Sequence, residues 1–213
     1  PISPNFGLGR LTTAEGPDGR QRAVYDLRGR VVLALDEIQG EAAATRYQYR
    51  PDLDRLEGMT YPDGERVRYG YDAAGQPAWL SEVDAAGNWL AYYVRQVVYD
   101  LRGRPLAIER GNLTTDRFEY HDANEGFALA RISTRSAGAK VFDPRTVYVD
   151  LAYRDYDAKG RLLRVDDLRD GAGPLSMTAS YAYDGIGRLT AVGGSSPEAF
   201  AYDGIGNLVA IGS

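Results

Sequence analysis

The 213-residue sequence contains no cysteine, one histidine, two methionines and two lysines. The absence of cysteine excludes a disulfide framework, a thiolate zinc site and a cysteine nucleophile. Apolar runs such as Val31–Leu35 are far shorter than the ~20 residues that cross a bilayer, and the first residues lack the pattern of a signal peptide. A formal charge of −5 without a basic cluster argues against nucleic acid as a partner. We therefore expect a soluble chain that neither inserts into membranes nor binds nucleic acid.

The residues that are abundant indicate strands and turns. The sequence has 25 glycines, 10 prolines and 16 tyrosines. Glycine and proline favour turns, and tyrosine favours strands, whereas the scarce lysine and methionine favour helices. Because the sequence begins at Pro1 rather than Met, we also expect a processed piece or a segment of a longer protein.

One five-residue pattern recurs along the chain. It consists of Asp, two variable residues, Gly, and then Arg, Gln or Asn, and it occurs seven times where composition alone predicts roughly 0.4 copies. In six copies the Asp directly follows a Tyr. The paired Asp and Gly positions are Asp26 and Gly29, Asp72 and Gly75, Asp84 and Gly87, Asp100 and Gly103, Asp157 and Gly160, Asp184 and Gly187, and Asp203 and Gly206.

The pattern, here called the pentad, has the chemistry of a tight hairpin turn. Asp at the first turn position accepts a hydrogen bond from the backbone two residues on, and Gly at the fourth takes a positive φ. Before the pentads residues alternate as on a strand, for example Val67, Tyr69 and Tyr71. Further turn triplets begin at Pro17 and Pro62. The spacing predicts an antiparallel meander with strands of about six to ten residues.

Several units depart from the pattern. Residues 49–56 hold one extra turn residue, with Asp54 in the glycine position. Tyr120, His121 and Asp122 are followed by Gly126 rather than by a glycine three places on. Gly9 and Arg10 have the sequence of a repeat's end. We read these segments as degenerate copies of the same unit.

The segment from Tyr181 to Thr190, YAYDGIGRLT, resembles the core of the YD repeat found in Rhs proteins, in the BC components of bacterial Tc toxins and in teneurins. The resemblance covers about Gly9 to Asn207. It implies an all-β fold in which antiparallel β-hairpin (YD) repeats form a curled, spiralling sheet, part of a hollow shell or barrel. In bacterial members such a shell encloses a toxic polypeptide, and in teneurins the barrel serves cell-surface adhesion. A sheet of a dozen or more strands also has to twist rather than lie flat.

The resemblance has one informative gap. Complete Rhs-type shells end in a plug with an Asp-Pro-x-Gly-Leu autoproteolysis motif, whereas the only Asp-Pro here, Asp143-Pro144, is followed by Arg145-Thr146. We therefore expect residues 1–213 to form a single YD-repeat array without cleavage machinery or cargo. The array is either a shell segment or a small stand-alone array.

The sequence predicts no catalytic residue, metal site or cofactor. His121 lies between Tyr120 and Asp122, but neighbouring strand residues point to opposite faces and do not easily cooperate. Asp155 with Asp157, and Asp166 with Asp167, could pair as glycosidase carboxylates, although a solvated loop edge is the better interpretation. Gly185-Ile186-Gly187 lacks the following helix of a dinucleotide site. The arginines after the turn glycines are interpreted as cross-strand packing and pairing residues.

The aromatic cluster of Trp79, Trp89, Tyr92 and Tyr93 is the candidate ligand patch, because aromatic rings with polar tips suit sugar stacking or protein contact. Two functions remain. The first is a structural shell segment of a secreted toxin or adhesin, whose partners are neighbouring repeats or an enclosed polypeptide. The second is a cell-surface module that recognises a glycan or a protein. Both place the chain outside the cell. If the chain is a shell segment, its exposed edge strands are expected to drive self-association. A β-propeller would fit the length, but the tight Tyr-Asp hairpins argue against it.

Overall fold

The computed structural model describes residues 5–136 and 147–212. These residues form strands β1 to β17 in antiparallel pairs within one sheet, with two short 3-10 helices, η1 (Ala123–Glu125) and η3 (Gly173–Leu175). The predicted all-β hairpin fold is thereby confirmed. Pro1 and the Asp-Pro pair at 143–144 lie outside the described residues. No helix in the described residues is long and apolar enough to cross a membrane.

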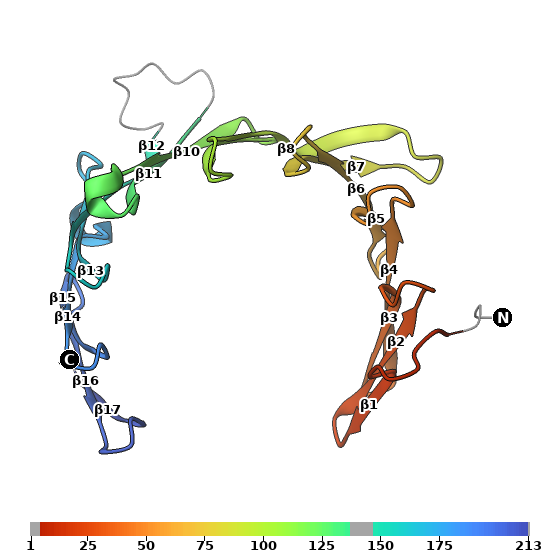
Figure 1. Cartoon of the computed structure of the whole chain (residues 1–213), viewed down its shortest axis with the longest axis horizontal. Helices are drawn as coiled ribbons and strands as arrows, with labels where there is room; N and C mark the ends of the chain where they lie inside the picture. The colour runs from red at the N-terminus through yellow and green to blue at the C-terminus, as the bar shows by residue number, and fades with distance from the viewer. Residues whose placement is uncertain (1–4, 137–146, 213) are drawn as a thin grey trace. The chain divides into compact units, whose positions relative to one another are not determined.

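The chain divides into two compact units, Pro1–Val97 and Val98–Ser213. In the first unit each strand pairs with the next along the chain (Figure 1). Its strands are β1 (Thr13–Gly16), β2 (Gly19–Tyr25), β3 (Val31–Ile38), β4 (Glu41–Tyr49), β5 (Leu56–Thr60), β6 (Arg66–Tyr71), β7 (Pro77–Val83) and β8 (Trp89–Tyr99), the last of which ends two residues beyond the unit boundary.

The second unit repeats this arrangement, again with each strand paired to the next. Its strands are β9 (Pro105–Arg110), β10 (Thr114–Tyr120), β11 (Leu129–Ser136), β12 (Val147–Tyr156), β13 (Leu162–Asp167), β14 (Ala179–Tyr183), β15 (Leu189–Gly194), β16 (Glu198–Tyr202) and β17 (Leu208–Gly212).

The pentad turns gather at one edge of the sheet in each unit. Because consecutive strands are antiparallel, successive turns alternate between the two edges. In the first unit the turns at Asp26, at residues 50–55 and at Asp72 join the strands at the same ends, and this side of the sheet is here called the pentad edge. The second unit has its own pentad edge, which carries the turns at Asp100, 121–128, Asp157, Asp184 and Asp203. The Asp84 turn lies at the opposite edge of the first unit, and Asp84 is the one pentad aspartate that follows Val rather than Tyr.

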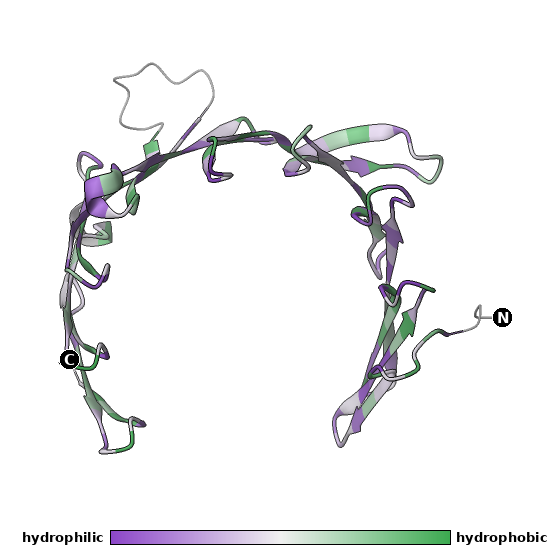
Figure 2. Cartoon of the chain, viewed as in Figure 1, coloured by the Kyte–Doolittle hydropathy of each residue, from purple (hydrophilic) through white to green (hydrophobic). Residues whose placement is uncertain are grey.

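The sheet has little apolar core. The buried hydrophobic residues are Leu33, Val67, Ala152 and Val165, and in the described part of the chain no large hydrophobic residue is fully buried. Hydrophobic and hydrophilic residues are interleaved along the strands of both units (Figure 2). Since apolar burial normally supplies most of the folding free energy, other contacts must contribute an unusual share here.

Some turns were not predicted. Gln39 and Gly40 join β3 to β4 as a two-residue loop in which both residues have positive φ, 50° and 84°. Such loops favour Asn-Gly or Asp-Gly, so the Gln-Gly sequence did not indicate a turn at this position. The strands also range from four residues in β1 to eleven in β8, wider than the predicted six to ten.

Candidate functional site

The pentads share one turn geometry. In the Asp184 pentad the carboxylate accepts hydrogen bonds from the backbone N–H of Ile186 at 3.1 Å and of Arg188 at 2.9 Å, while the Gly187 N–H donates to the Asp184 carbonyl at 3.0 Å. All seven pentad aspartates accept the N–H of the fifth pentad residue. The seven pentad glycines have φ between 76° and 97°.

Pentad arginines link one turn to the next. Arg188 donates to the Asp184 carboxylate at 2.6 Å and lies over the ring of Tyr202, 4.6 Å from its centroid. This arginine also holds the pKa of Asp184 below its ordinary value. Sequence reasoning predicted the cross-strand packing but missed the pairing of the arginine with the aspartate of its own turn. The same stacking occurs for Arg10 on Tyr25, Arg30 on Tyr49, Arg55 on Tyr71, Arg104 on Tyr120 and Arg161 on Tyr183.

The tyrosine hydroxyls complete the link. The Tyr202 hydroxyl donates to the Leu189 carbonyl at 2.9 Å, directly after the arginine that covers its ring. The stacked arginines and bonded tyrosines form a series along the pentad edge of each unit, here called the pentad ladder. The equivalent hydroxyl bonds are Tyr25 to Leu11, Tyr71 to Leu56, Tyr120 to Pro105, Tyr156 to Leu129 and Tyr183 to Leu162, with lengths from 2.6 to 3.0 Å.

We expect Tyr202→Phe to lower the free energy of unfolding by about 1 kcal/mol, because a neutral hydrogen bond contributes roughly that much. Urea denaturation measures the effect. Tyr181→Phe is the matched control, since Tyr181 precedes the ladder residue Tyr183 by two positions on β14 and its hydroxyl is not part of the ladder. Equal losses in the two variants would show that the ladder bond contributes nothing specific.

The degenerate turns use substitutes for the missing residues. Asp54 occupies the glycine position with φ 52°. His121 occupies the aspartate position, because its N–H donates to the Ala128 carbonyl as a pentad aspartate would to the fifth residue. The His121 ring lies edge-on to Tyr156 with centroids 5.9 Å apart, and its Nδ1 is 2.8 Å from Glu125. The His121 ring therefore contacts the tyrosine of the next hairpin, as the arginines of other turns do, and Glu125 is its acidic partner.

The carboxylates weighed as acid and base groups are engaged in other contacts. Asp157 belongs to a pentad turn, and Asp166 pairs with Arg154 and Arg164 at 3.2 and 2.7 Å. Asp122, the neighbour of His121, accepts the Asn124 N–H at the start of η1. These contacts give Asp157, Asp166 and Asp122 structural roles in turns and ion pairs.

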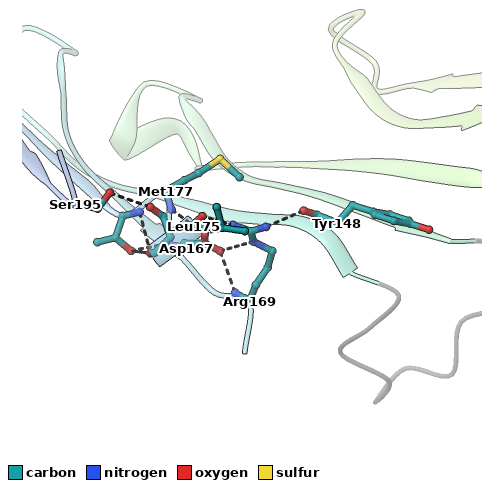
Figure 3. A network of polar contacts seen from close by, with 8 residues as sticks. Tyr148, Asp167, Arg169, Leu175, Met177 and Ser195 are labelled. Carbon is teal, nitrogen blue, oxygen red and sulfur yellow. Dashed lines mark hydrogen bonds and ion pairs between the residues drawn. The ribbon is translucent and has the colours of Figure 1, made fainter. Parts of the chain in front are cut away.

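Asp167 is the centre of a network between β13 and β14 (Figure 3). Its carboxylate is fully shielded, at 0% exposure, and accepts from the Arg169 guanidinium and from the Met177 N–H at 2.9 Å. Arg169 also donates to the carbonyls of Tyr148 and Leu175, at 3.2 and 3.0 Å. These hydrogen bonds, led by that of Arg169, hold the pKa of Asp167 well below its usual range. The network fixes the long connection from β13 to β14.

Two further aspartates of the second unit are buried against arginines. Asp150, at 5% exposure, accepts from Arg131 at 2.7 Å and from Arg135 at 2.9 Å. Asp116, at 8%, pairs with Arg110 and accepts from the Thr134 hydroxyl at 2.8 Å. Arginine therefore neutralises the buried acids, which agrees with its excess over lysine. In the described residues, no group of three or more His, Asp or Glu could hold a metal ion.

The four residues of the predicted aromatic patch lie in three different environments. Trp89 and Tyr92 form an exposed pair, with ring centroids 5.3 Å apart and planes inclined by 48°. Trp79 covers Gly70, where an added Cβ would lie 1.9 Å from the indole ring. The Tyr93 hydroxyl donates instead to Glu65, and this bond raises the pKa of Tyr93 to about 12. The structure therefore brings together two of the four residues.

Comparison with known proteins agrees with the repeat geometry. Residues 50–88 match the family description RHS Repeat. The chain is 27% identical over 168 residues to Teneurin-1 of Gallus gallus, and equally to that of Homo sapiens. The repeats of the chain are therefore similar to those of the Rhs/YD-repeat family. The match covers 78% of the chain but 5% of each teneurin.

Solved structures share the fold of the chain. The Photorhabdus luminescens Tc holotoxin pore with the TccC3-D651A mutation matches 95% of the chain with a TM-score of 0.69, and TcdB2-TccC3 matches 95% with a TM-score of 0.70. Each is 19% identical, so the likeness concerns the fold alone. The chain spans 11% of the first and 12% of the second.

Proposed function

We propose that the chain is a non-catalytic structural module, a YD-repeat shell segment of an exported protein that encloses or scaffolds a polypeptide. The observation that carries this proposal is the pentad ladder. It binds each turn to the next by a hydrogen bond and a stacked guanidinium, so that a thin sheet holds together without a thick core. A sheet of this kind suits the wall of a shell. The enclosed polypeptide and the location outside the cell are proposed from the resemblance to YD-repeat proteins.

A chimera tests the shell function. Residues 5–212 would replace the structurally matched stretch of the TcdB2-TccC3 chain, and protection of its interior polypeptide from added protease would be measured. The proposal predicts protection close to that of the parent. The matched control chimera carries Arg161→Leu and Arg188→Leu, which remove two ladder arginines, and is expected to leak. Intact particles by electron microscopy that protect nothing would contradict the proposal.

The last strand of the second unit favours self-association. Every residue of β17 is exposed, including Val209 at 60% and Ile211 at 62%, and the strand carries neither charge nor proline. Unprotected apolar edge strands tend to pair with other chains. We expect the isolated chain to form dimers or larger species and Val209→Lys to shift it toward monomer in sedimentation. Ile205→Lys, in the exposed turn before β17, adds the same charge away from the edge and should change nothing. A clean monomer of the unmodified chain at tens of micromolar would contradict the expectation.

A recognition module is the second candidate, favoured by the exposed ring pair of Trp89 and Tyr92. Trp89 is 58% exposed and Tyr92 39%, although large aromatic side chains are usually well buried. A glycan array would test it. Binding that disappears in Trp89→Ala and persists in Tyr148→Ala, which removes an equally exposed ring from the second unit, would support recognition. If no glycan on the array binds, only the structural function remains.

A further inference from the structure

The strand registers of the first unit place the exposed rings and several arginines on one face of the sheet. One row of directly opposed residues crosses five strands: Gln48, Gly58, Arg68, Ser81 and Tyr92. Opposed residues of antiparallel strands point to the same face.

A second row lies two residues away along the same strands and therefore on the same face. It contains Arg46, Thr60 and Arg66, which are opposed in that order. Trp89 belongs to this face as well, because its ring contacts that of Tyr92. Three guanidiniums and two exposed aromatic rings thus share one surface, here called the arginine–aromatic face.

The arginines line a groove of about 400 Å³. Arg46 and Arg66 form no ion pair with a carboxylate of the described residues, and Arg68 reaches Glu57 only at 3.5 Å. The other acid at the groove is Asp84, whose carboxylate is already occupied by the N–H groups of Ala86 and Asn88. Three guanidiniums and two carboxylates thus line the groove, which gives it a formal charge of +1 in a chain whose net charge is −5.

The combination of groups indicates the ligand. A guanidinium fork pairs with a carboxylate through two parallel hydrogen bonds. Trp89 and Tyr92 offer an apolar surface with polar tips, which suits the flat apolar face of a sugar ring. An acidic peptide would use the arginines but leave the ring pair without a role. A pyranose that carries a carboxylate uses both.

We propose that the arginine–aromatic face of the first unit binds an acidic oligosaccharide, a chain of uronate or sialate sugars. The proposal deepens the recognition candidate and rests on it, and it is independent of the structural function. Sugar rings stack on Trp89 and Tyr92 while their carboxylates pair with Arg66 and Arg68, and the Gln48 amide is available to sugar hydroxyls.

Titration calorimetry on the full chain tests this with three probes: hexagalacturonate, its fully methyl-esterified form and hexaglutamate. We expect hexagalacturonate to bind. The methyl ester should bind at least about tenfold more weakly, since a charge-assisted hydrogen bond is worth roughly tenfold or more. Hexaglutamate keeps the carboxylates but has no ring to stack on Trp89 and Tyr92, so it should also bind at least about tenfold more weakly. Arg66→Gln and Trp89→Ala should each weaken binding by about tenfold, and Arg66→Lys, which keeps the charge without the fork, by less. Arg117→Gln and Tyr148→Ala are the matched controls, an exposed arginine and an exposed tyrosine of the second unit.

The other outcomes overturn the proposal in distinguishable ways. Equal binding of the methyl ester means that the face reads neutral sugars, so recognition stands and the acidic ligand class falls. Stronger binding of hexaglutamate means that it binds an acidic peptide. No binding by any probe removes the sugar ligand while the shell function, tested by the chimera, is unaffected. Equal losses in the second-unit controls mean that binding is unspecific.

Discussion

Asp167→Asn will lower the free energy of unfolding by about 2 to 3 kcal/mol, the cost of losing one charged partner from a buried, hydrogen-bonded ion pair. The carboxylate is fully shielded, and its two oxygens accept from Arg169 and from the Met177 N–H. An asparagine keeps one acceptor, but its amide N–H₂ group would face donors and the guanidinium would lose its counter-charge. Urea denaturation at neutral pH measures the change. The matched control is Asp170→Asn on the same connection, which is exposed and should cost under about 0.5 kcal/mol.

Acid should reduce this difference. The pKa of Asp167 is depressed in the folded chain, so its carboxylate stabilises the fold fully above the unfolded pKa of about 3.9 and progressively less as the pH falls below it. The gap between the unmodified chain and Asp167→Asn is therefore largest at pH 7 and smaller at pH 3. A gap that stays constant between these two values would mean that the asparagine acts through shape rather than through charge.

Sequence reasoning located the turns because a turn is a local requirement. Asp must cap and Gly must adopt positive φ within four residues, so the seven-fold recurrence was enough to identify them. Asp167 looked the same in sequence as a solvated loop residue. Its partners come from residues up to ten positions away on a connection whose path no short-range pattern specifies.

The aromatic patch shows a second limit. Tyr92 and Tyr93 are adjacent in sequence, yet Tyr92 stacks with Trp89 while Tyr93 bonds to Glu65. Alternation along the strand accounts for the separation of Tyr92 from Tyr93, but it would also separate Trp89 from Tyr92, which are three residues apart. Trp89 and Tyr92 share a face because the pairing of β7 with β8 shifts register at Glu82/Val83. Such a bulge inserts one residue and changes which side chains share a face. Alternation counted along β8 alone therefore could not predict that Trp89 and Tyr92 lie on the same face.

Gly187→Val will destabilise the chain far more than Gly185→Ala, by about 1 to 3 kcal/mol for valine held at positive φ. Gly187 has φ 97°, and its N–H must still donate to the Asp184 carbonyl for the turn to close. Gly185 lies in the same turn, but its φ is not positive and no heavy atom lies within 4 Å of an added Cβ. Other pentads hold Leu27, Ala73 and Leu101 in that position.

Backbone strain at position 187 would also affect the pentad ladder. Arg188 directly follows Gly187, and it both pairs with Asp184 and covers Tyr202, so a distorted turn would weaken the contact with the next hairpin as well. The loss in Gly187→Val should therefore exceed that of a local defect and should be smaller when Arg188→Leu is already present. Thermal unfolding of the single variants Gly187→Val, Gly185→Ala and Arg188→Leu, and of the Gly187→Val, Arg188→Leu double variant, measures this coupling. Equal losses for Gly187→Val and Gly185→Ala would contradict the turn register, and strict additivity with Arg188→Leu would show that the turn and the ladder are energetically independent.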